Sequence, residues 1–198
     1  MYPPSRIVCL TEETVETLYL MGDQDRIIGV SGFVVRPPEA RRKPKVSTFI
    51  EAKTDEIVAL KPDLVFTFSD IQADITANLM REGLDVHAFN HRTVEGIFDM
   101  IRTVGALIGE PEKAEKLAAD LQHHVDAVRE KANGLARRPK VYFEEWDDPM
   151  ISAIGWVSEL IEIAGGENVF ADRAFGQAAK DRFVTAEEVI AAQPDIII

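Results

Sequence analysis

A phrase that occurs twice, as a helical pattern, a Pro-Asp pair and an apolar run, constrains the fold of this chain most strongly. The first copy, "EIVALKPDLVFTF", runs from Glu56 to Phe68, and the second, "EVIAAQPDIII", runs from Glu188 to Ile198. The proline in each copy ends the helix because it lacks an N–H and its ring clashes with the preceding turn. The apolar run that follows has no polar alternation, which is typical of a strand buried on both faces of a parallel sheet. The chain is therefore predicted to build the same helix, turn and strand twice.

Matching segments also precede each copy, in the same order. "VETLYLMG" from Val15 and "VSELIEIAGG" from Val157 are apolar-periodic helices that a glycine closes. Before them come two predicted first strands, "RIVCLT" from Arg6 and "KVYFEEW" from Lys140. Because both matches recur in one order, we interpret the chain as a duplication of one α/β unit.

A long helix is predicted between the two copies. The segment from Glu110 to Gly134 is rich in Ala, Glu, Lys and Leu, with Pro111 at a first helical position and Gly134 past the end. The predicted fold class is α/β, with two Rossmann-like lobes that contain parallel sheets and are joined by this one helix. The predicted domains are an N-terminal lobe over 1–109, the linking helix over 110–135 and a C-terminal lobe over 136–198.

The first copy is followed by further elements, and the second is not. After Phe68 the sequence predicts a helix and a strand in "IQADITANLMREGLDVHAFN" and another helix in "TVEGIFDMIRTVGALIG". Nothing comparable follows Ile198, and an unpaired strand edge is an aggregation liability. We therefore expect the C-terminal lobe to be truncated in this sequence and the natural chain to continue.

Composition narrows the function classes. The net charge of −12, from 22 basic and 34 acidic residues, argues against nucleic acid as a partner, because phosphates require Lys and Arg. The single cysteine, Cys9, lies in an apolar run and is predicted to be a core residue. No stretch approaches the roughly 18 apolar residues of a membrane span. The sequence contains no GxSxG, Walker A, GxGxxG or HExxH motif, so no enzymatic activity is predicted.

Several segments together resemble the helical-backbone class of ABC-transporter substrate-binding proteins, whose members bind cobalamin, siderophores or haem. These are the opening strand, "RIIGVSGF", "PPEARRKPKVSTF", "EIVALKPDLVFTF" and "LIEIAGGENVF", in the order and spacing of that class from Arg6 to Ile198. The cobalamin binders are the most similar members. The resemblance implies a non-catalytic component of an ABC importer, which holds a corrinoid in the cleft between two lobes and delivers it to a membrane permease. It also implies a monomer, a periplasmic location and no cofactor of its own.

Alternatives to this interpretation stay open. A ligand of the same kind would be a ferric siderophore or haem, and a different class of protein would be a cytoplasmic corrinoid sensor or enzyme on the same fold. The N-terminal residues show neither the charged nor the apolar region of a signal peptide, so a cytoplasmic location is also open. The four histidines predict no zinc or manganese site, because His123 and His124 are adjacent on the linking helix and no third ligand is set near His87 and His91.

Aromatic residues mark the predicted ligand site. In open α/β sheets, ligands bind at the carboxyl ends of the strands. A large flat ligand such as a corrin requires aromatic faces there, because each ring buries a large apolar area. Phe68 and Trp146 are assigned to the site because polar residues flank them, whereas Phe33, Phe49 and Trp156 could equally be core residues. The candidate aromatic contacts are Phe33, Phe49, Phe68, Trp146 and Phe175.

Charged residues complete the predicted site. The run "EEWDD" from Glu144 to Asp148 lacks the glycine spacing of a calcium loop, so it is interpreted as a solvated or amide-binding loop. Glu145 in this run is a candidate ligand contact, and the run disfavours anionic ferric siderophores. Arg173 and Arg182 could contact a ligand or simply be surface charges, and Arg182 is retained as a candidate.

The segment "SDIQADITANLMREG" is predicted to contact the permease. In the family that the chain resembles, an acidic side chain at the start of the helix after the Pro-Asp strand points toward arginines of the transporter. Asp74 matches this position by spacing, and Asp70 is the second candidate. A carboxylate in the first turn is also stabilised by the helix dipole. The alternative is that Asp70 caps the helix and Asp74 only lies in its first turn.

Overall fold

The computed structural model describes residues 2–198, and these form two compact units. Unit 1 contains the residues up to 91 and residues 99–119, and unit 2 contains residues 92–98 and 120–198. The division falls inside two helices, α4 (Val94–Ile108) and α5 (Pro111–Ala132). The predicted boundaries, 1–109, 110–135 and 136–198, differ from these units because the first turns of α5 pack in unit 1, where Lys113 pairs with Asp23 at 2.8 Å.

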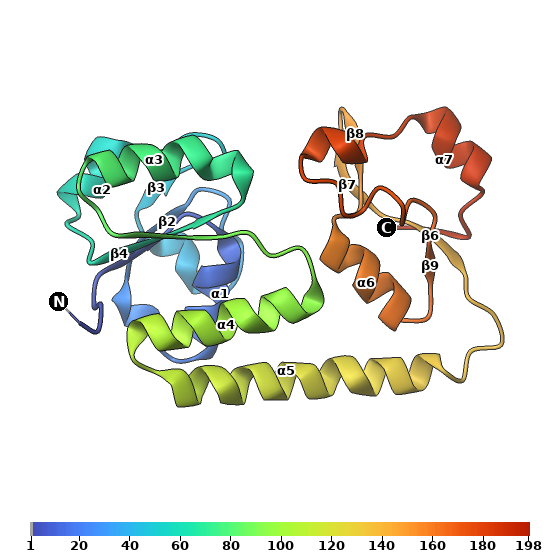
Figure 1. Cartoon of the computed structure of the whole chain (residues 1–198), viewed down its shortest axis with the longest axis horizontal. Helices are drawn as coiled ribbons and strands as arrows, with labels where there is room; N and C mark the ends of the chain where they lie inside the picture. Colours follow the sequence, from blue (N-terminus) through green and yellow to red (C-terminus); the bar gives the residue numbers. More distant parts are fainter. Residues whose placement is uncertain (1) are drawn as a thin grey trace. The chain divides into compact units, whose positions relative to one another are not determined.

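Unit 1 is built on a five-stranded sheet in the order β3-β2-β1-β4-β5, and every neighbouring pair is parallel. The central pair is in the register Ile7↔Leu64, Val8↔Val65, so the strand after the first Pro-Asp pair lies beside the first strand of the chain. The strands can be followed in Figure 1. They are β1 (Ile7–Cys9), β2 (Ile27–Ser31), β3 (Lys45–Ser47), β4 (Leu64–Phe68) and β5 (Val86–Phe89).

Helices cover both faces of this sheet, as the uninterrupted apolar strands require (Figure 1). Helices α2 (Thr54–Ala59) and α3 (Ala73–Arg81) lie on one face, and α1 (Glu12–Leu20) and α4 lie on the other. Cys9 is fully buried, as predicted, and burial raises the pKa of its thiol to about 12. The core under α2 and α3 consists of Val8, Leu10, Val46, Ile57, Val65, Ile75 and Leu79.

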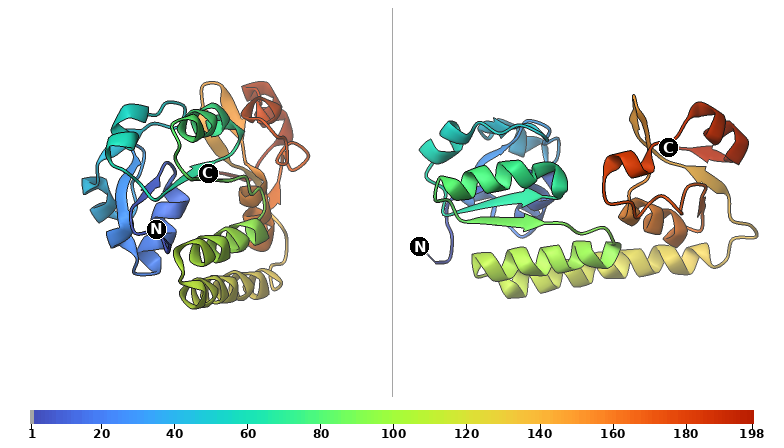
Figure 2. Two further views of the ribbon diagram at one scale, coloured as in Figure 1. Left: turned by 60° about the vertical axis from the view of Figure 1, so that its left-hand side comes forward. Right: turned by 45° about the horizontal axis from the view of Figure 1, so that its top comes forward.

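Within unit 1, the end of α4 and the start of α5 lie side by side, as Figure 2 shows from two directions. Gly105 is the position of closest approach, because a Cβ atom added there would lie 2.2 Å from Ala114 Cβ and 3.0 Å from the Glu110 carbonyl oxygen. The helix α5 begins at Pro111, as predicted, and ends at Ala132 before Gly134. Arg102 pairs with Glu115 at 2.8 Å on the outside of the same contact.

Unit 2 repeats the central strand order of unit 1. Its parallel sheet has the order β10-β6-β9, which corresponds to β4-β1-β2, so the predicted duplication is confirmed at the level of topology. Helix α6 (Gly155–Ile163) precedes β9, and helix α7 (Ala186–Ala192) precedes β10. No helix among residues 2–198 has the length and hydropathy needed to cross a membrane. The strands are β6 (Lys140–Tyr142), β9 (Glu167–Asn168) and β10 (Ile196–Ile197).

The strand predicted from Lys140 to Trp146 is wrong in its second half. The parallel strand β6 ends at Tyr142, and the chain then forms β7 (Glu144–Asp147), which pairs antiparallel with β8 (Met150–Ser152). A turn containing Asp148-Pro149 joins the two strands, and such residues favour turns. The acidic run therefore lies on a hairpin (the β7–β8 hairpin) that extends beyond the parallel sheet.

Both Pro-Asp phrases contain a backbone feature that the sequence does not reveal. The residue before each proline, Lys61 and Gln193, has a positive φ, 49° and 51° respectively. A residue before proline normally adopts an extended conformation. Here the left-handed residue ends the helix in the way that glycine often does, as Gly22 and Gly165 do after α1 and α6 with φ of 77° and 85°.

Candidate functional site

Two predicted ligand contacts, Phe33 and Phe49, form a stacked pair. Phe33 follows β2 and Phe49 follows β3, so both lie at the carboxyl ends of neighbouring strands. Their ring centroids are 4.5 Å apart with an interplanar angle of 19°. The rings are 46% and 39% exposed, so they are not core residues. We call this pair the aromatic platform. Val35 and Ile50, which are close to it in the sequence, are also exposed apolar side chains.

Phe68 ends β4 at the same edge of the unit 1 sheet. Its ring lies 4.9 Å from the imidazole of His91, which follows β5. The next residue, Ser69, has φ 61° and ψ 176°, a conformation that residues other than glycine rarely adopt. The Ser69 N–H donates to the Phe89 carbonyl at 2.6 Å, and its Oγ accepts from the N–H of Ile71. The chain therefore turns sharply at the end of β4 under local strain, and strain of this kind is common at binding sites.

Gln72, which the sequence analysis does not single out, is buried next to the end of β4, where its side chain bonds the backbone. Its side chain is 1% exposed and lies in the 3₁₀ turn Asp70–Gln72. Its Oε1 accepts from the N–H of Phe68, and its Nε2 donates to the carbonyl oxygens of Leu10 and Phe49. The sequence gives no signal for this role, because a glutamine beside a helix start is usually a surface residue.

In unit 2, the predicted contacts Glu145 and Arg182 bind each other. Arg182 is 5% exposed, donates to both carboxylate oxygens of Glu145, and also donates to the Ser152 carbonyl at 2.7 Å. The pair thus ties the β7–β8 hairpin to the 3₁₀ turn Ala179–Arg182. Trp146, also predicted, lies on the same hairpin and is 56% exposed, with its Nε1 donating to the Asp148 carbonyl.

The electrostatics at the end of β6 are dominated by carboxylates. The hydroxyl of the buried Tyr142 donates to Glu144 Oε2 at 3.2 Å, and burial together with this carboxylate raises the pKa of Tyr142 to about 12.

Arg173, the other arginine considered as a ligand contact from the sequence, instead donates to Glu188 and to the Phe183 carbonyl. The β7–β8 hairpin also presents hydrogen-bond acceptors to solvent, because three of its acidic side chains are exposed: Glu144, Asp147 and Asp148.

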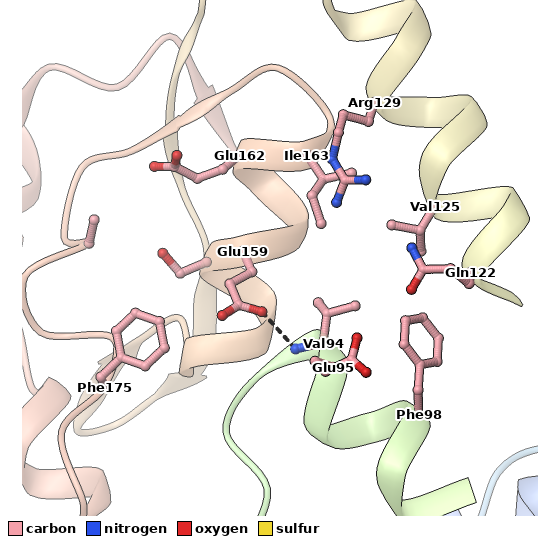
Figure 3. A pocket seen from close by; sticks show the side chains of 12 residues that line it. Val94, Glu95, Phe98, Gln122, Val125, Arg129, Glu159, Glu162, Ile163 and Phe175 are labelled. Carbon is pink, nitrogen blue, oxygen red and sulfur yellow. Dashed lines mark hydrogen bonds between the residues drawn. The ribbon is translucent and has the colours of Figure 1, made fainter. Parts of the chain in front are cut away.

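Phe175, the last predicted aromatic contact, lines a cavity of about 520 Å³ in unit 2 (Figure 3). The ring lies against Gly155 at the start of α6, where an added Cβ would be 2.8 Å from it. Glu159 Oε2 accepts from the N–H of Val94 at 2.6 Å, the bond drawn in Figure 3. The apolar lining is Val94, Phe98, Val125, Ile163, Ala171 and Phe175, and the polar lining is Glu95, Gln122, Arg129, Ser158, Glu159 and Glu162.

The predicted docking residues lie at the start of α3. Asp74 is exposed in the first turn and lines a second cavity, of about 630 Å³, with Ser47, Lys53 and Asn78 among the other lining residues. The alternative role of Asp70 as a helix cap is wrong. The capping residue is Ser69, and α3 itself begins after Gln72, whose side chain makes no capping bond.

Each unit exposes aromatic or charged side chains near the carboxyl ends of its strands. Among residues 2–198, no three His, Cys, Asp or Glu side chains come together as a group that could hold a metal ion. Unit 1 presents aromatic faces at the ends of β2, β3 and β4, and unit 2 presents Trp146 with carboxylates at the end of β6. The unit 1 surface can contact apolar faces of a ligand, and the unit 2 surface can accept hydrogen bonds from donor groups.

Comparison with known proteins places these features in a family. Residues 7–198 match the family model described as periplasmic binding protein. The vitamin B12-binding protein of Vibrio parahaemolyticus is 30% identical over 198 residues, an alignment that covers 98% of this chain and 70% of the relative.

Solved structures share the fold. The periplasmic vitamin B12 binding protein BtuF of Vibrio cholerae is 25% identical with a TM-score of 0.81, covering 98% of this chain and 76% of the other. The periplasmic heme-binding protein RhuT from Roseiflexus sp. RS-1 is 26% identical with a TM-score of 0.83, covering 98% and 75%. The predicted α/β fold class is therefore confirmed.

Proposed function

Because the chain belongs to the periplasmic binding protein family, we propose that it is the non-catalytic substrate-binding component of an ABC importer and that it binds a cobalamin-like corrinoid. A relative that is 30% identical and a structure that is 25% identical are both named for vitamin B12, which supports this ligand. The partners are then the corrinoid and a membrane permease, and the place of action is the periplasm. Oligomeric state and the absence of a cofactor stay predictions.

The observation that carries the proposal is the stacked pair Phe33–Phe49. Two half-exposed rings that stack at the carboxyl ends of neighbouring strands form an exposed apolar patch, and such patches often mark a ligand site. A corrin offers a broad apolar face for such rings and neutral amide groups around its rim. Aromatic contact areas of this kind dominate the affinity of many ligand sites.

The acidic hairpin of unit 2 favours a neutral ligand rim over an anionic one. Glu144, Asp147 and Asp148 are exposed carboxylates, which accept hydrogen bonds from amides and repel carboxylates or other anions. A single ligand that contacts both the unit 1 aromatic residues and this hairpin stays a prediction.

A haem ligand is the second candidate, and one observation favours it. His91 places an imidazole beside the Phe68 ring at the same edge of the unit 1 sheet, and imidazole is a common ligand of haem iron. The RhuT structure, named for haem, supports this alternative.

A titration with three ligands distinguishes these proposals. Cyanocobalamin, haemin and a ferric hydroxamate siderophore are each added to the protein, with calorimetry and the fluorescence of Trp146 and Trp156 as readouts. We expect saturable one-to-one binding of cyanocobalamin and weaker or no binding of the other two. Saturable haemin binding with a shifted Soret band, and no response to cyanocobalamin, would replace the corrinoid by haem. The absence of binding by all three would overturn the proposed ligand class.

A further inference from the structure

The side chain of Gln72 connects the ends of three strands, one of which is separated from the other two in the sheet. Leu10 follows β1, Phe49 follows β3 and Phe68 ends β4. Strands β1 and β4 are neighbours, but β2 separates β1 from β3, so no ladder hydrogen bond joins the end of β3 to the other two. Gln72 bridges this gap with bonds of 3.0 Å to Phe68 N, 3.1 Å to the Leu10 carbonyl and 3.3 Å to the Phe49 carbonyl.

The chemistry of these partners requires an amide side chain. One partner is an N–H donor and two are carbonyl acceptors, so the side chain must offer an oxygen on one side and an NH₂ group on the other. A glutamate carboxylate has no donor, and a methionine has neither donor nor strong acceptor. Because the side chain is 1% exposed, water cannot replace a lost bond without opening the site.

Two of the three partners are residues assigned to the ligand site. Phe49 is half of the aromatic platform, and Phe68 adds the ring beside His91. Ser69, between Phe68 and Gln72, holds its strained conformation while its carbonyl accepts from the Gln72 N–H at 3.3 Å. One buried side chain thus bonds the backbone of both aromatic residues.

We propose that Gln72 is a positioning residue, which holds Phe49 and Phe68 in the geometry that receives the ligand before the ligand arrives. This inference rests on the proposed function, because it assigns Gln72 to the corrinoid surface. A binding surface that is already ordered loses less conformational entropy on binding, so removing the tie weakens affinity without touching the ligand. Because its side chain is 1% exposed, Gln72 acts through Phe49 and Phe68 rather than by contact with the ligand.

The test uses Gln72→Met and Gln72→Glu, with Thr67→Val as the matched control. Thr67 is fully buried on β4, and its hydroxyl bonds Thr76 of α3 at 2.8 Å, so the control removes a β4–α3 bond without touching the strand-end loops. Hydrogen exchange of the unliganded protein reports the positioning directly. We expect faster exchange over 48–51 in both Gln72 variants, faster exchange of the Phe68 amide in Gln72→Met, and neither change in Thr67→Val.

Cyanocobalamin titration supplies the functional readout. We expect both Gln72 variants to bind about tenfold more weakly than the wild type, and Thr67→Val to bind equally well. Unchanged exchange over 48–51, or faster exchange with unchanged affinity, overturns the positioning role. If the wild type does not bind cyanocobalamin, the proposed ligand fails, and the exchange data alone then decide whether Gln72 orders the strand-end loops.

Discussion

Asp63 and Asp195 perform the same task in the two units: the Oδ2 atom of each accepts hydrogen bonds from backbone N–H groups at the entrance to the first strand of its unit. For Asp63 these donors are Ser5 and Arg6, at 2.9 and 3.0 Å, and for Asp195 the donor is Lys140 at 2.8 Å. The bond is returned in both units, because the aspartate N–H donates to the carbonyl of Arg6 or Lys140. The repeated Pro-Asp pair therefore joins the start of one strand to the start of its neighbour.

The first prediction concerns the pH dependence of these two carboxylates. The backbone bond from Ser5 lowers the pKa of Asp63 below its ordinary 3.8, and the bond from Lys140, followed by Arg137, does so for Asp195. A lowered folded-state pKa stabilises the protein above the ordinary value, and this stabilisation is lost as the pH falls through the folded-state pKa. Asp63→Asn and Asp195→Asn should therefore be less stable than the wild type at neutral pH, and the difference should close in acid. Urea denaturation at several pH values checks this, with the exposed Glu82→Gln as control.

The second prediction concerns the contact between α4 and α5 in unit 1. Gly105→Ala places a Cβ 2.2 Å from Ala114 Cβ, so overpacking should lower the free energy of unfolding by about 1–3 kcal/mol, despite alanine's better helix propensity. The double variant Gly105→Ala/Ala114→Gly removes the clash and should recover part of the loss. Thermal unfolding followed by circular dichroism measures both, and a Gly105→Ala variant as stable as the wild type contradicts the contact.

The third prediction concerns the pair Arg182–Glu145. Arg182→Met leaves the carboxylate without its partner and the Ser152 carbonyl without a donor, so the free energy of unfolding should fall by about 2–3 kcal/mol. The near-ultraviolet circular dichroism of Trp146 on the same hairpin should weaken as well. Lys53→Ala, which removes an exposed pair with Glu56, is the control and should cost at most about 0.5 kcal/mol. Equal losses of stability in the two variants would show that the Arg182–Glu145 pair contributes no more than an exposed ion pair.

The fourth prediction tests the aromatic platform. Phe33→Ala and Phe49→Ala should each weaken cyanocobalamin binding about tenfold, because each removes a large apolar contact area. The double variant should lose less than the sum of the two, since the rings stack on each other. Leu20→Ala, at a side chain that is 60% exposed on α1, should leave the affinity unchanged. Wild-type affinity in both phenylalanine variants contradicts the platform as a ligand surface.

The fifth prediction tests the permease contact at Asp74. Asp74→Arg reverses an exposed charge in the first turn of α3, so it should leave cyanocobalamin affinity unchanged and weaken binding to a permease with basic residues. The measurement is vitamin uptake into proteoliposomes that contain the transporter. Asp85→Arg, at an exposed position before β5, is the matched reversal and should not affect uptake. Uptake that is intact with Asp74→Arg shows that this carboxylate is only a helix-terminus residue.

The sequence predicted the parts of the fold that depend on local chemistry. Prolines, glycine caps and apolar periods located β1, β4, α1, α5 and α6, because those residues act on the adjacent backbone. The β7–β8 hairpin was missed because "KVYFEEW" contains no turn residue where β6 ends and β7 begins, and only Asp148-Pro149 marks the turn of the hairpin. The left-handed Lys61 and Gln193 were missed because residues before proline usually adopt extended conformations.

The site was less predictable because its geometry depends on residues far apart in the sequence. The sequence placed Phe33 and Phe49 at strand ends, but their stacking depends on the pairing of β2 with β3. Arg182 was predicted as a ligand contact, and only the structure shows its guanidinium bound to Glu145. Gln72 has partners up to 62 residues away, and no local pattern records them.

The bond between Glu159 and the N–H of Val94 gives the synthesis of this chain a particular order in time. Val94 leaves the ribosome 65 residues before Glu159. At 5–20 residues per second, this interval is roughly 3–13 s. For the first part of that time residues 92–98 have been made while none of the rest of unit 2, which begins at residue 120, has been made. The nascent chain must therefore keep the first turn of α4 available while residues 99–119 complete unit 1, so unit 2 cannot finish folding from a contiguous piece of the polypeptide.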